Sequence, residues 1–364
     1  MKSGRTIQAM AAEIRRQGEV KADYMVDTRC LRMEIWDGQP FLLALNESGH
    51  DLMELMDIQT TAHRQLSAYL DIPIKYYEKM RRNDPELLAH NVNCWLQRVD
   101  PAQRMLRTLD GHARAFLSSR YRRIDNYDVA RIVTPVVGEM PDIQFGSCEL
   151  TEDYMYLKVV NPRLQDEVRP GDVVQAGVSI SNSETGRGAV SVCPLVYRLV
   201  CTNGMTATDS TASKMRRTHS GPRILTNRQF FVCAAEVLTD SDQDFVRSLQ
   251  AAVHDAMDEA RFVQMLNQMR ESTQMELNMD NLDEVVKRAA ACVHITEAES
   301  AGILQHLHTD GDYTLYGLAN AVTRYSQDVE SYDRASKLEE IGYTVMTMAP
   351  ELFRRINQVT GIAV

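Results

Sequence analysis

Residues 154–204 read YMYLKVVNPRLQDEVRPGDVVQAGVSISNSETGRGAVSVCPLVYRLVCTNG and decide the fold that we expect for this chain. Three runs within them, 154–160, 173–180 and 189–201, are rich in the β-branched and aromatic residues that favour strands. The segment 182–188 contains Asn, Ser and Gly, which accept the backbone angles of a tight turn, so the second and third runs should form a hairpin. The stretch therefore predicts a central antiparallel sheet.

The segments before this sheet predict a small mixed module. Apolar residues recur at helical spacing over 6–18 and 85–100, and the pattern of 24–46 predicts a β-hairpin. Residues 60–82 predict two helices joined by a short turn at Pro73, with Lys and Arg exposed on the second. That outline fits a helix-turn-helix that contacts DNA, but the pattern is loose and most helix pairs joined by a short turn only pack.

The segments after the sheet predict helices. Residues 226–235 resemble the start of a helical region, Ser241 with Asp244 suits a helix cap, and Thr296 with Glu299 fits a capping box. The expected fold class is α+β, with a central antiparallel sheet, packed helices and a C-terminal all-helical domain. The expected domains are a small α/β module, a sheet-centred core and an acidic helical domain, at 1–100, 101–232 and 233–364.

Composition indicates a globular protein without a membrane span. Hydrophobic residues make up 44% of the 364 residues and charged residues 25%. The apolar runs are shorter than the roughly 18 residues that a bilayer requires, and the first residues lack the apolar segment of a signal peptide. The seven cysteines are scattered without a C-x-x-C pair. We therefore expect a reduced cytoplasmic compartment and no cysteine-built metal site. No metal ligand and no cofactor are assigned from the sequence.

The charge is distributed unevenly along the chain. Residues 101–230 carry 17 Lys and Arg against 13 Asp and Glu, a net charge of +4, whereas residues 231–364 carry 10 against 22, a net charge of −12. Two short segments are strongly basic: 104–123, predicted as short strands with outward arginines, and the loop 214–223. This asymmetry indicates an anionic partner for the middle of the chain.

Several separated motifs resemble those of a known family. They are SNSETG at 181–186, YRLVCTNG at 197–204, SRYR at 119–122 and NAVT at 320–323. In this order they resemble a phage- and plasmid-borne family of unknown function, over roughly residues 100–340. The resemblance implies a mobile element in a bacterial host and assigns no catalytic residue. The motif positions are Asn182, Ser183, Glu184, Gly186, Arg198, Cys201, Asn203 and Gly204.

Single-stranded DNA binding, with strand annealing as a possible activity, is the function that these features favour. Three antiparallel strands followed by a long helix are also similar, at the level of fold, to Rad52-like phage annealing proteins. Arginines would hold phosphates while an aromatic ring stacks on a base, and annealing requires no acid, base or metal. The predicted contact residues are Arg120, Tyr121, Arg122, Arg123, Lys214, Arg216, Arg217 and Arg223. A homo-oligomer is expected.

Three alternatives stay open. The arginines could simply pair with acids, such as Asp125, Asp128 and Glu184, on an ordinary surface. A metal-dependent nuclease could gather carboxylates around the sheet, although their spacing matches no tight motif. The residues considered for it are Glu152, Asp153, Asp172 and Glu184, with Lys158. A non-enzymatic interaction protein could use its acidic helices to bind a partner or to oligomerise.

Further expectations concern individual residues. The hairpin could bring Glu184 and Arg198 near each other as a structural ion pair, and Cys201 is expected to be a buried apolar residue. GRG at 186–188 lacks the Gly-Lys-Ser/Thr of a phosphate loop, so nucleotide hydrolysis is not expected.

Overall fold

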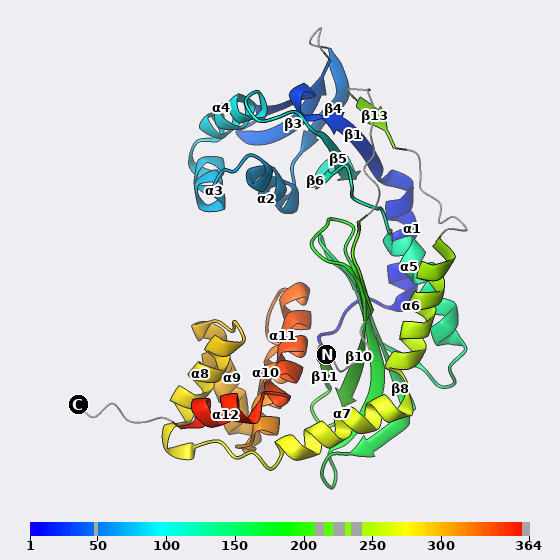
Figure 1. Cartoon of the computed structure of the whole chain (residues 1–364), viewed down its shortest axis with the longest axis vertical. Helices are drawn as coiled ribbons and strands as arrows, with labels where there is room; N and C mark the ends of the chain where they lie inside the picture. Colours follow the sequence, from blue (N-terminus) through cyan, green and yellow to red (C-terminus); the bar gives the residue numbers. More distant parts are fainter. Residues whose placement is uncertain (47–49, 208–214, 221–229, 234–241, 359–364) are drawn as a thin grey trace, which may run out of the picture.

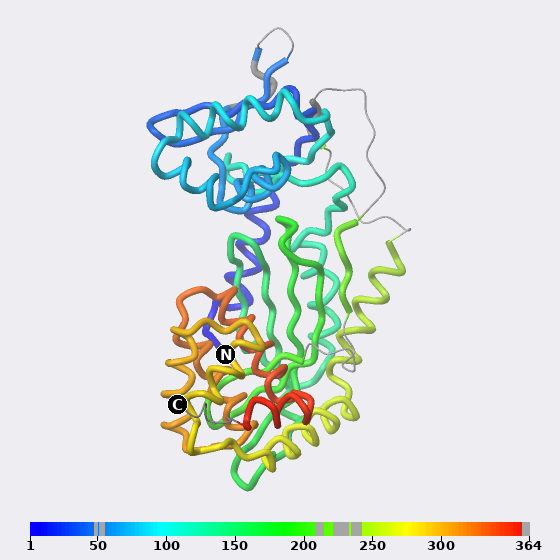
Figure 2. Tube along the Cα trace, turned by 60° about the vertical axis from the view of Figure 1, so that its left-hand side comes forward, coloured from blue at the N-terminus to red at the C-terminus, as the bar shows by residue number. Residues whose placement is uncertain are grey.

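The computed structural model describes residues 1–46, 50–207, 215–220, 230–233 and 242–358. Within them the chain combines helices with antiparallel sheets, so the predicted α+β class is confirmed (Figure 1). An N-terminal lobe stands beyond one end of a central sheet. The C-terminal helices lie beside the half of the sheet that is farther from this lobe, as Figure 2 also shows.

In the residues that the structure describes, the N-terminal lobe contains two small antiparallel sheets and three α-helices. Its elements are β1 (Ala22–Asp27), β2 (Leu31–Trp36), β3 (Gln39–Leu45), β4 (Asp51–Asp57), α2 (Thr60–Tyr69), α3 (Ile74–Asn83), α4 (Pro85–Leu96), β5 (Gln103–Leu109), β6 (His112–Ser118) and β13 (Phe230–Val232). The strand orders are β2-β3-β4 and β13-β1-β5-β6. Buried residues such as Leu66, Val92 and Phe116 form a shared core between the helices and the sheets.

The predicted hairpin over 24–46 is only partly right. β2 and β3 do pair, with Trp36 opposite Gln39, but Tyr24–Asp27 belong to β1 in the other sheet. β1 pairs with β5, and β5 with β6. The predicted boundary at residue 100 therefore cuts through one sheet of the N-terminal lobe.

The central sheet contains the three strands predicted within 154–204, together with strands from residues before and after them. Its strands are β7 (Gln144–Leu150), β8 (Met155–Glu167), β9 (Val173–Asn182), β10 (Val190–Arg198), β11 (Asn203–Thr206) and β12 (Met215–Arg217). The order is β11-β10-β9-β8-β7, with β12 pairing β10. The hairpin of β9 and β10 has the expected antiparallel register, with Ser181 opposite Ser191.

The two faces of this sheet differ in character because side chains alternate along each strand. Leu157 and Ile180 point to one face, where they pack on three helices. These are α1 (Ile7–Val20), α5 (Asn126–Gly138) and α6 (Gln243–Ala256), which lie along that face in Figure 1. Tyr156, Ser181 and Ser191 point to the opposite face, which looks toward a C-terminal helix and is partly open.

The C-terminal helices share a second large core with the farther half of the sheet. They are α7 (Glu259–Ser272), α8 (Leu282–Cys292), α9 (Glu297–Asp310), α10 (Leu315–Tyr325), α11 (Tyr332–Met346) and α12 (Pro350–Asn357). Val174 and Val196 of the sheet pack with Leu318 and Leu338 of these helices. The capping box of Thr296 with Glu299 is present as predicted.

One local prediction does not match. Phe230–Val232 forms strand β13 opposite Tyr24–Val26, rather than the start of a helix. Pairing with β1 makes this segment a strand, and the local sequence of 226–235 does not reveal that partner. Helix α6 begins at Gln243, after Asp242. Ser241, half of the predicted cap, lies outside the described residues.

Candidate nucleic-acid interface

The turn between β9 and β10 is built around two glycines. Gly186 has φ +76°, the left-handed region that glycine accepts without strain. A Cβ on Gly186 would lie 2.5 Å from Leu117 Cδ2, and one on Gly188 would lie 2.6 Å from the ring of Tyr154. The turn therefore fits closely between the N-terminal lobe and β8.

Glu184 in this turn is a buried anchor rather than a surface acid. Its side chain is 4% exposed and forms an ion pair with Arg114 of β6. Its Oε1 also accepts a hydrogen bond from the backbone N–H of Asn126, at 2.6 Å, and lies 3.7 Å from Lys21 Nζ. The carboxylate therefore joins the central sheet to three elements that flank it.

Arg107 extends this cluster into the N-terminal lobe. It is fully buried and donates to Asp23 at 2.8 Å, to Asp125 at 2.7 Å and to the carbonyl oxygen of Glu184 at 3.1 Å. Burial alone would lower the pKa of Arg107, but the surrounding carboxylates raise it well above its usual value. The expectation that arginines of 104–123 alternate outward is thus wrong for Arg107 and Arg114, because the acids of the lobe interface hold them inside.

The arginines at 120, 122 and 123 do not form a common basic surface. Arg122 forms an ion pair with Asp242, and Arg123 forms one with Asp23 at 3.3 Å. The structure brings both predicted contact residues into pairs with carboxylates. Arg120 is the exposed member of the set.

Tyr121 is buried, which corrects its predicted role as a base-stacking residue. Only 8% of it is exposed, and its ring stacks on His219 with 5.0 Å between the ring centroids. Its hydroxyl donates to the carbonyl oxygen of Ser183 at 3.1 Å. Asn182 is also buried and donates to the carbonyl oxygen of Ile124. The motifs at 119–122 and 181–186 therefore hold the turn in place.

The second motif faces the C-terminal helices. Arg198 forms an ion pair with Asp172 at 2.5 Å, whereas Glu184 pairs with Arg114. The expected proximity of Arg198 to Glu184 is therefore wrong. Cys201 is only partly buried, and its Sγ accepts from Arg198 Nη1 at 3.3 Å. The expectation of a buried apolar cysteine is therefore also wrong.

Two distant motifs meet in the same region. Asn203 is buried and donates to Thr323 Oγ1 at 2.5 Å, and it also contacts the carbonyl oxygen of Asn320. A Cβ on Gly204 would lie 2.6 Å from Met1 Cγ, so a side chain there would displace the side chain of Met1. The two halves of the motif set therefore hold the sheet to the N-terminal lobe and to the C-terminal helices respectively.

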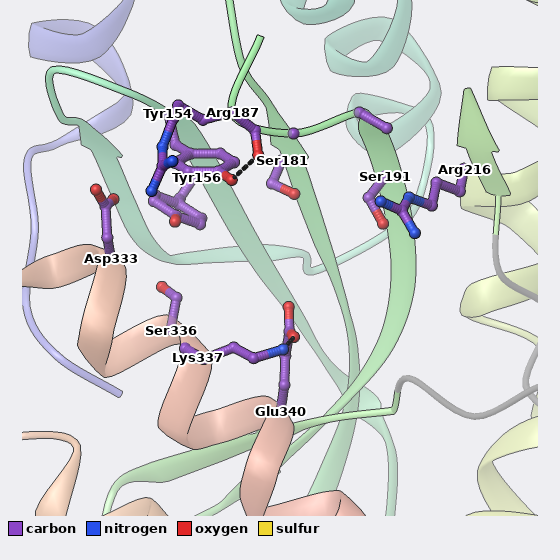
Figure 3. Close-up of a pocket in the computed structure, with 12 residues that line it drawn as sticks. Tyr154, Tyr156, Ser181, Arg187, Ser191, Arg216, Asp333, Ser336, Lys337 and Glu340 are labelled. Carbon is purple, nitrogen blue, oxygen red and sulfur yellow. Dashed lines mark hydrogen bonds and ion pairs between the residues drawn. The ribbon is translucent and has the colours of Figure 1, made fainter. Parts of the chain in front are cut away.

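A cleft of about 420 Å³ lies on the open face of the sheet, between the strands and α11. It is lined by Tyr154, Tyr156, Ser181, Arg187, Gly188, Ala189, Ser191, Arg216, Asp333, Ser336, Lys337 and Glu340. Figure 3 shows α11 facing the strands across this space. The cleft has the size of a site for a nucleotide or another small polar molecule.

An adjoining hollow of about 280 Å³ lies toward the N-terminal lobe. Arg187, Gly188, Ala189 and Arg216 line both the hollow and the cleft, and we call these four residues the rim. Arg187 is 44% exposed, with Asp153 at 3.5 Å, and Arg216 is exposed on β12 without an ion pair to any residue that the structure describes. The rim is thus a positively charged edge between two hollows.

The charges of the cleft are arranged on two sides. The rim arginines come from the sheet side, whereas Asp333, Lys337 and Glu340 come from α11, where Lys337 pairs with Glu340 at 2.7 Å. Burial raises the pKa of Asp333, although a hydrogen bond from Thr151 opposes the shift. The wall of α11 carries two acids and one cation, so an anionic group would be drawn to the rim rather than to this wall.

The other predicted contact residues fall in different places. Arg217 is exposed on β12 next to Arg216, but strand alternation turns it to the other face, and it lines neither hollow. Lys214 and Arg223 lie outside the described residues. The sequence reasoning missed Arg187, Tyr154 and the residues of α11, because only the fold brings them to one cleft.

The acids considered for a nuclease do not gather. Glu184 pairs with Arg114, Asp172 with Arg198, and Lys158 pairs with Glu339 at 2.7 Å inside the core. Among the residues that the structure describes, no three His, Cys, Asp or Glu side chains are placed to hold a metal ion. In the same residues, no helix has the length and apolar character of a membrane span.

The fold and site define an α+β protein with a polar cleft on the open face of its central sheet. Residues 114–345, well over half of the chain, match the family described as domain of unknown function DUF932, and the chain belongs to that family. No curated protein and no solved structure matches the chain.

Proposed function

We propose that the chain binds single-stranded nucleic acid, with the strand crossing the rim between the cleft and the adjoining hollow. The observation that supports this proposal is the pair of exposed guanidinium groups, Arg187 and Arg216, that both hollows share. Buried arginines such as Arg107 are enclosed by acids, whereas these two are open to solvent. Arg187 keeps one ion pair, with Asp153, and Arg216 forms none with a described residue. Guanidinium groups in such a position hold phosphates by charge-assisted hydrogen bonds.

The cleft suits the base of a bound nucleotide. Ser181, Ser191 and Ser336 offer hydroxyl groups, and Asp333 and Glu340 offer acceptors for amino groups of a base. Tyr154 is partly exposed and stacks on Tyr156 with 5.5 Å between the ring centroids. The acids on α11 repel phosphate, so the backbone would follow the rim and the base would enter the cleft.

Two neighbouring arginines on β12 provide a matched test. Arg216→Glu places a negative charge at the rim, whereas Arg217→Glu makes the same change on the other face. Fluorescence anisotropy with a labelled strand of about 20 nucleotides should show roughly tenfold weaker binding for Arg216→Glu and less than about threefold for Arg217→Glu. Equal affinities of the two variants would contradict a site at the rim.

Strand annealing in the recombination of mobile DNA is the finer activity that we propose. It requires bound strands to exchange partners, so fluorescence transfer between complementary labelled strands should rise faster with the protein than without it. Arg216→Glu should reduce this rate in parallel with binding. Tight binding with no acceleration would leave strand binding as the function and would contradict annealing.

A further inference from the structure

Helix α3 carries a row of basic residues that the rim does not include. Tyr77 and Met80 point into the core of the N-terminal lobe, so the opposite side of the helix faces solvent. That side displays Lys75, Lys79 and Arg82 at helical spacing. Three cations in one exposed row distinguish α3 from the buried arginines of the lobe interface.

The charges of α3 are largely uncompensated within the helix. Arg81 pairs with Glu78 at 3.2 Å, and Arg82 donates to the carbonyl oxygen of Glu78. Lys75 and Lys79 form no ion pair with any residue in the described part of the chain. With four cations and one acid, the ten-residue helix has a net charge of +3.

An exposed aromatic ring lies beside this row on the helix surface. Tyr76 is 47% exposed and follows Lys75 directly, with Lys79 one turn further along. Basic residues interleaved with an exposed tyrosine are the combination that binds single strands, because cations hold the backbone while the ring stacks on a base.

The position of α3 connects it to the rim. The neighbouring helix α2 reaches the turn directly, since Gln65 Nε2 donates to the carbonyl oxygen of Thr185 at 2.7 Å. Thr61 of α2 donates to Asp153 at 2.6 Å, and Asp153 lies beside Arg187 of the rim. In Figure 1, α2 and α3 lie on the side of the N-terminal lobe that faces the C-terminal helices.

We infer that α3 is a second contact site for nucleic acid, which holds phosphates of a strand that continues beyond the rim. The inference rests on the proposed function and adds a specific surface, Lys75, Tyr76, Lys79 and Arg82. A strand long enough to reach both sites should gain affinity from α3, whereas a strand that only fills the cleft should not.

The length of the oligonucleotide therefore separates the two sites. Anisotropy titrations compare wild type with Lys75→Glu/Lys79→Glu on strands of about 6 and about 30 nucleotides. The double variant should bind the long strand roughly tenfold more weakly and the short strand as wild type does. Both positions are exposed and Glu is a good helix former, so the fold should tolerate the change, which circular dichroism verifies.

Arg15→Glu/Lys287→Glu is the matched control. Arg15 on α1 and Lys287 on α8 are exposed, and this variant makes the same change in net charge away from α3. It should bind both strands as wild type does. An equal loss in the control and in the α3 variant would indicate a general electrostatic effect and overturn the inference.

The remaining outcomes are also decisive. Equal losses on short and long strands, or no loss on either, would overturn a second contact site while leaving the rim intact. Polyglutamate binding that is lost in the α3 variant, while the long strand binds that variant as it binds wild type, would indicate an acidic protein partner for α3 instead. A wild-type protein that binds neither strand would overturn the proposed function together with this inference.

Discussion

Glu184→Gln should destabilise the protein strongly although it removes only one charge. The substitution leaves the buried Arg114 guanidinium without its carboxylate, and Arg114 Nε already lacks a hydrogen-bond partner. Removing one member of a buried pair costs about 3–5 kcal/mol. The amide oxygen of the new side chain still accepts from the N–H of Asn126, and Arg107 keeps Asp23 and Asp125, so the lower end, about 3 kcal/mol, is expected.

Equilibrium unfolding in urea measures this difference, with Glu149→Gln as the control. Glu149 pairs with Arg5 at 2.7 Å, but the two side chains are 21% and 43% exposed. Solvent screens such a pair, so its loss should cost less than about 1 kcal/mol. If Glu184→Gln unfolds within about 1 kcal/mol of wild type, the buried cluster does not stabilise the junction of sheet and lobe as argued.

Two further predictions concern buried groups. Burial lowers the pKa of His219 to about 4, so the unfolded chain takes up its proton first and stability falls as pH drops from about 6.5 toward 4. His219→Gln should reduce the loss of unfolding free energy between pH 7 and about 4.5 by about 2–3 kcal/mol, and an unchanged pH dependence would contradict this. Lys158→Met should lower the free energy of unfolding in urea by about 3–5 kcal/mol, because Glu339 stays charged in the core without its partner. The double variant Lys158→Met/Glu339→Leu should recover most of this loss. Equal losses in the two variants would show that the unpaired Glu339 is not the cause.

Local patterns in the sequence predicted the elements of the fold more accurately than their pairing. The hairpin of β9 and β10 followed from strand propensity and the glycine-rich turn at 182–188. The capping box at Thr296 followed from hydrogen-bond chemistry within one turn of helix. Membership of β1 in a sheet with β5 could not be read locally, because residues about 80 positions apart pair there.

The candidate site was predicted less well, for a physical reason. Sequence counts charges but does not show where they are neutralised, so Arg107, Arg122 and Arg123 were counted as a basic surface. Their partners come from Asp23 and Asp242, which are distant in the chain. Arg216 was predicted and is exposed at the rim, whereas Arg187 was noted only as part of the glycine-rich turn.

The family match also divides the interface cluster. Residues 114–345 begin at Arg114 and include Glu184, so both partners of the buried pair lie within the matched range. Arg107 and Asp23, which complete the charge balance around the same turn, lie before it. The matched range alone would therefore leave Asp125 without its Arg107 partner and the carbonyl oxygen of Glu184 without a donor. In this chain the N-terminal lobe is part of the structure that holds the turn, and with it the rim, in place.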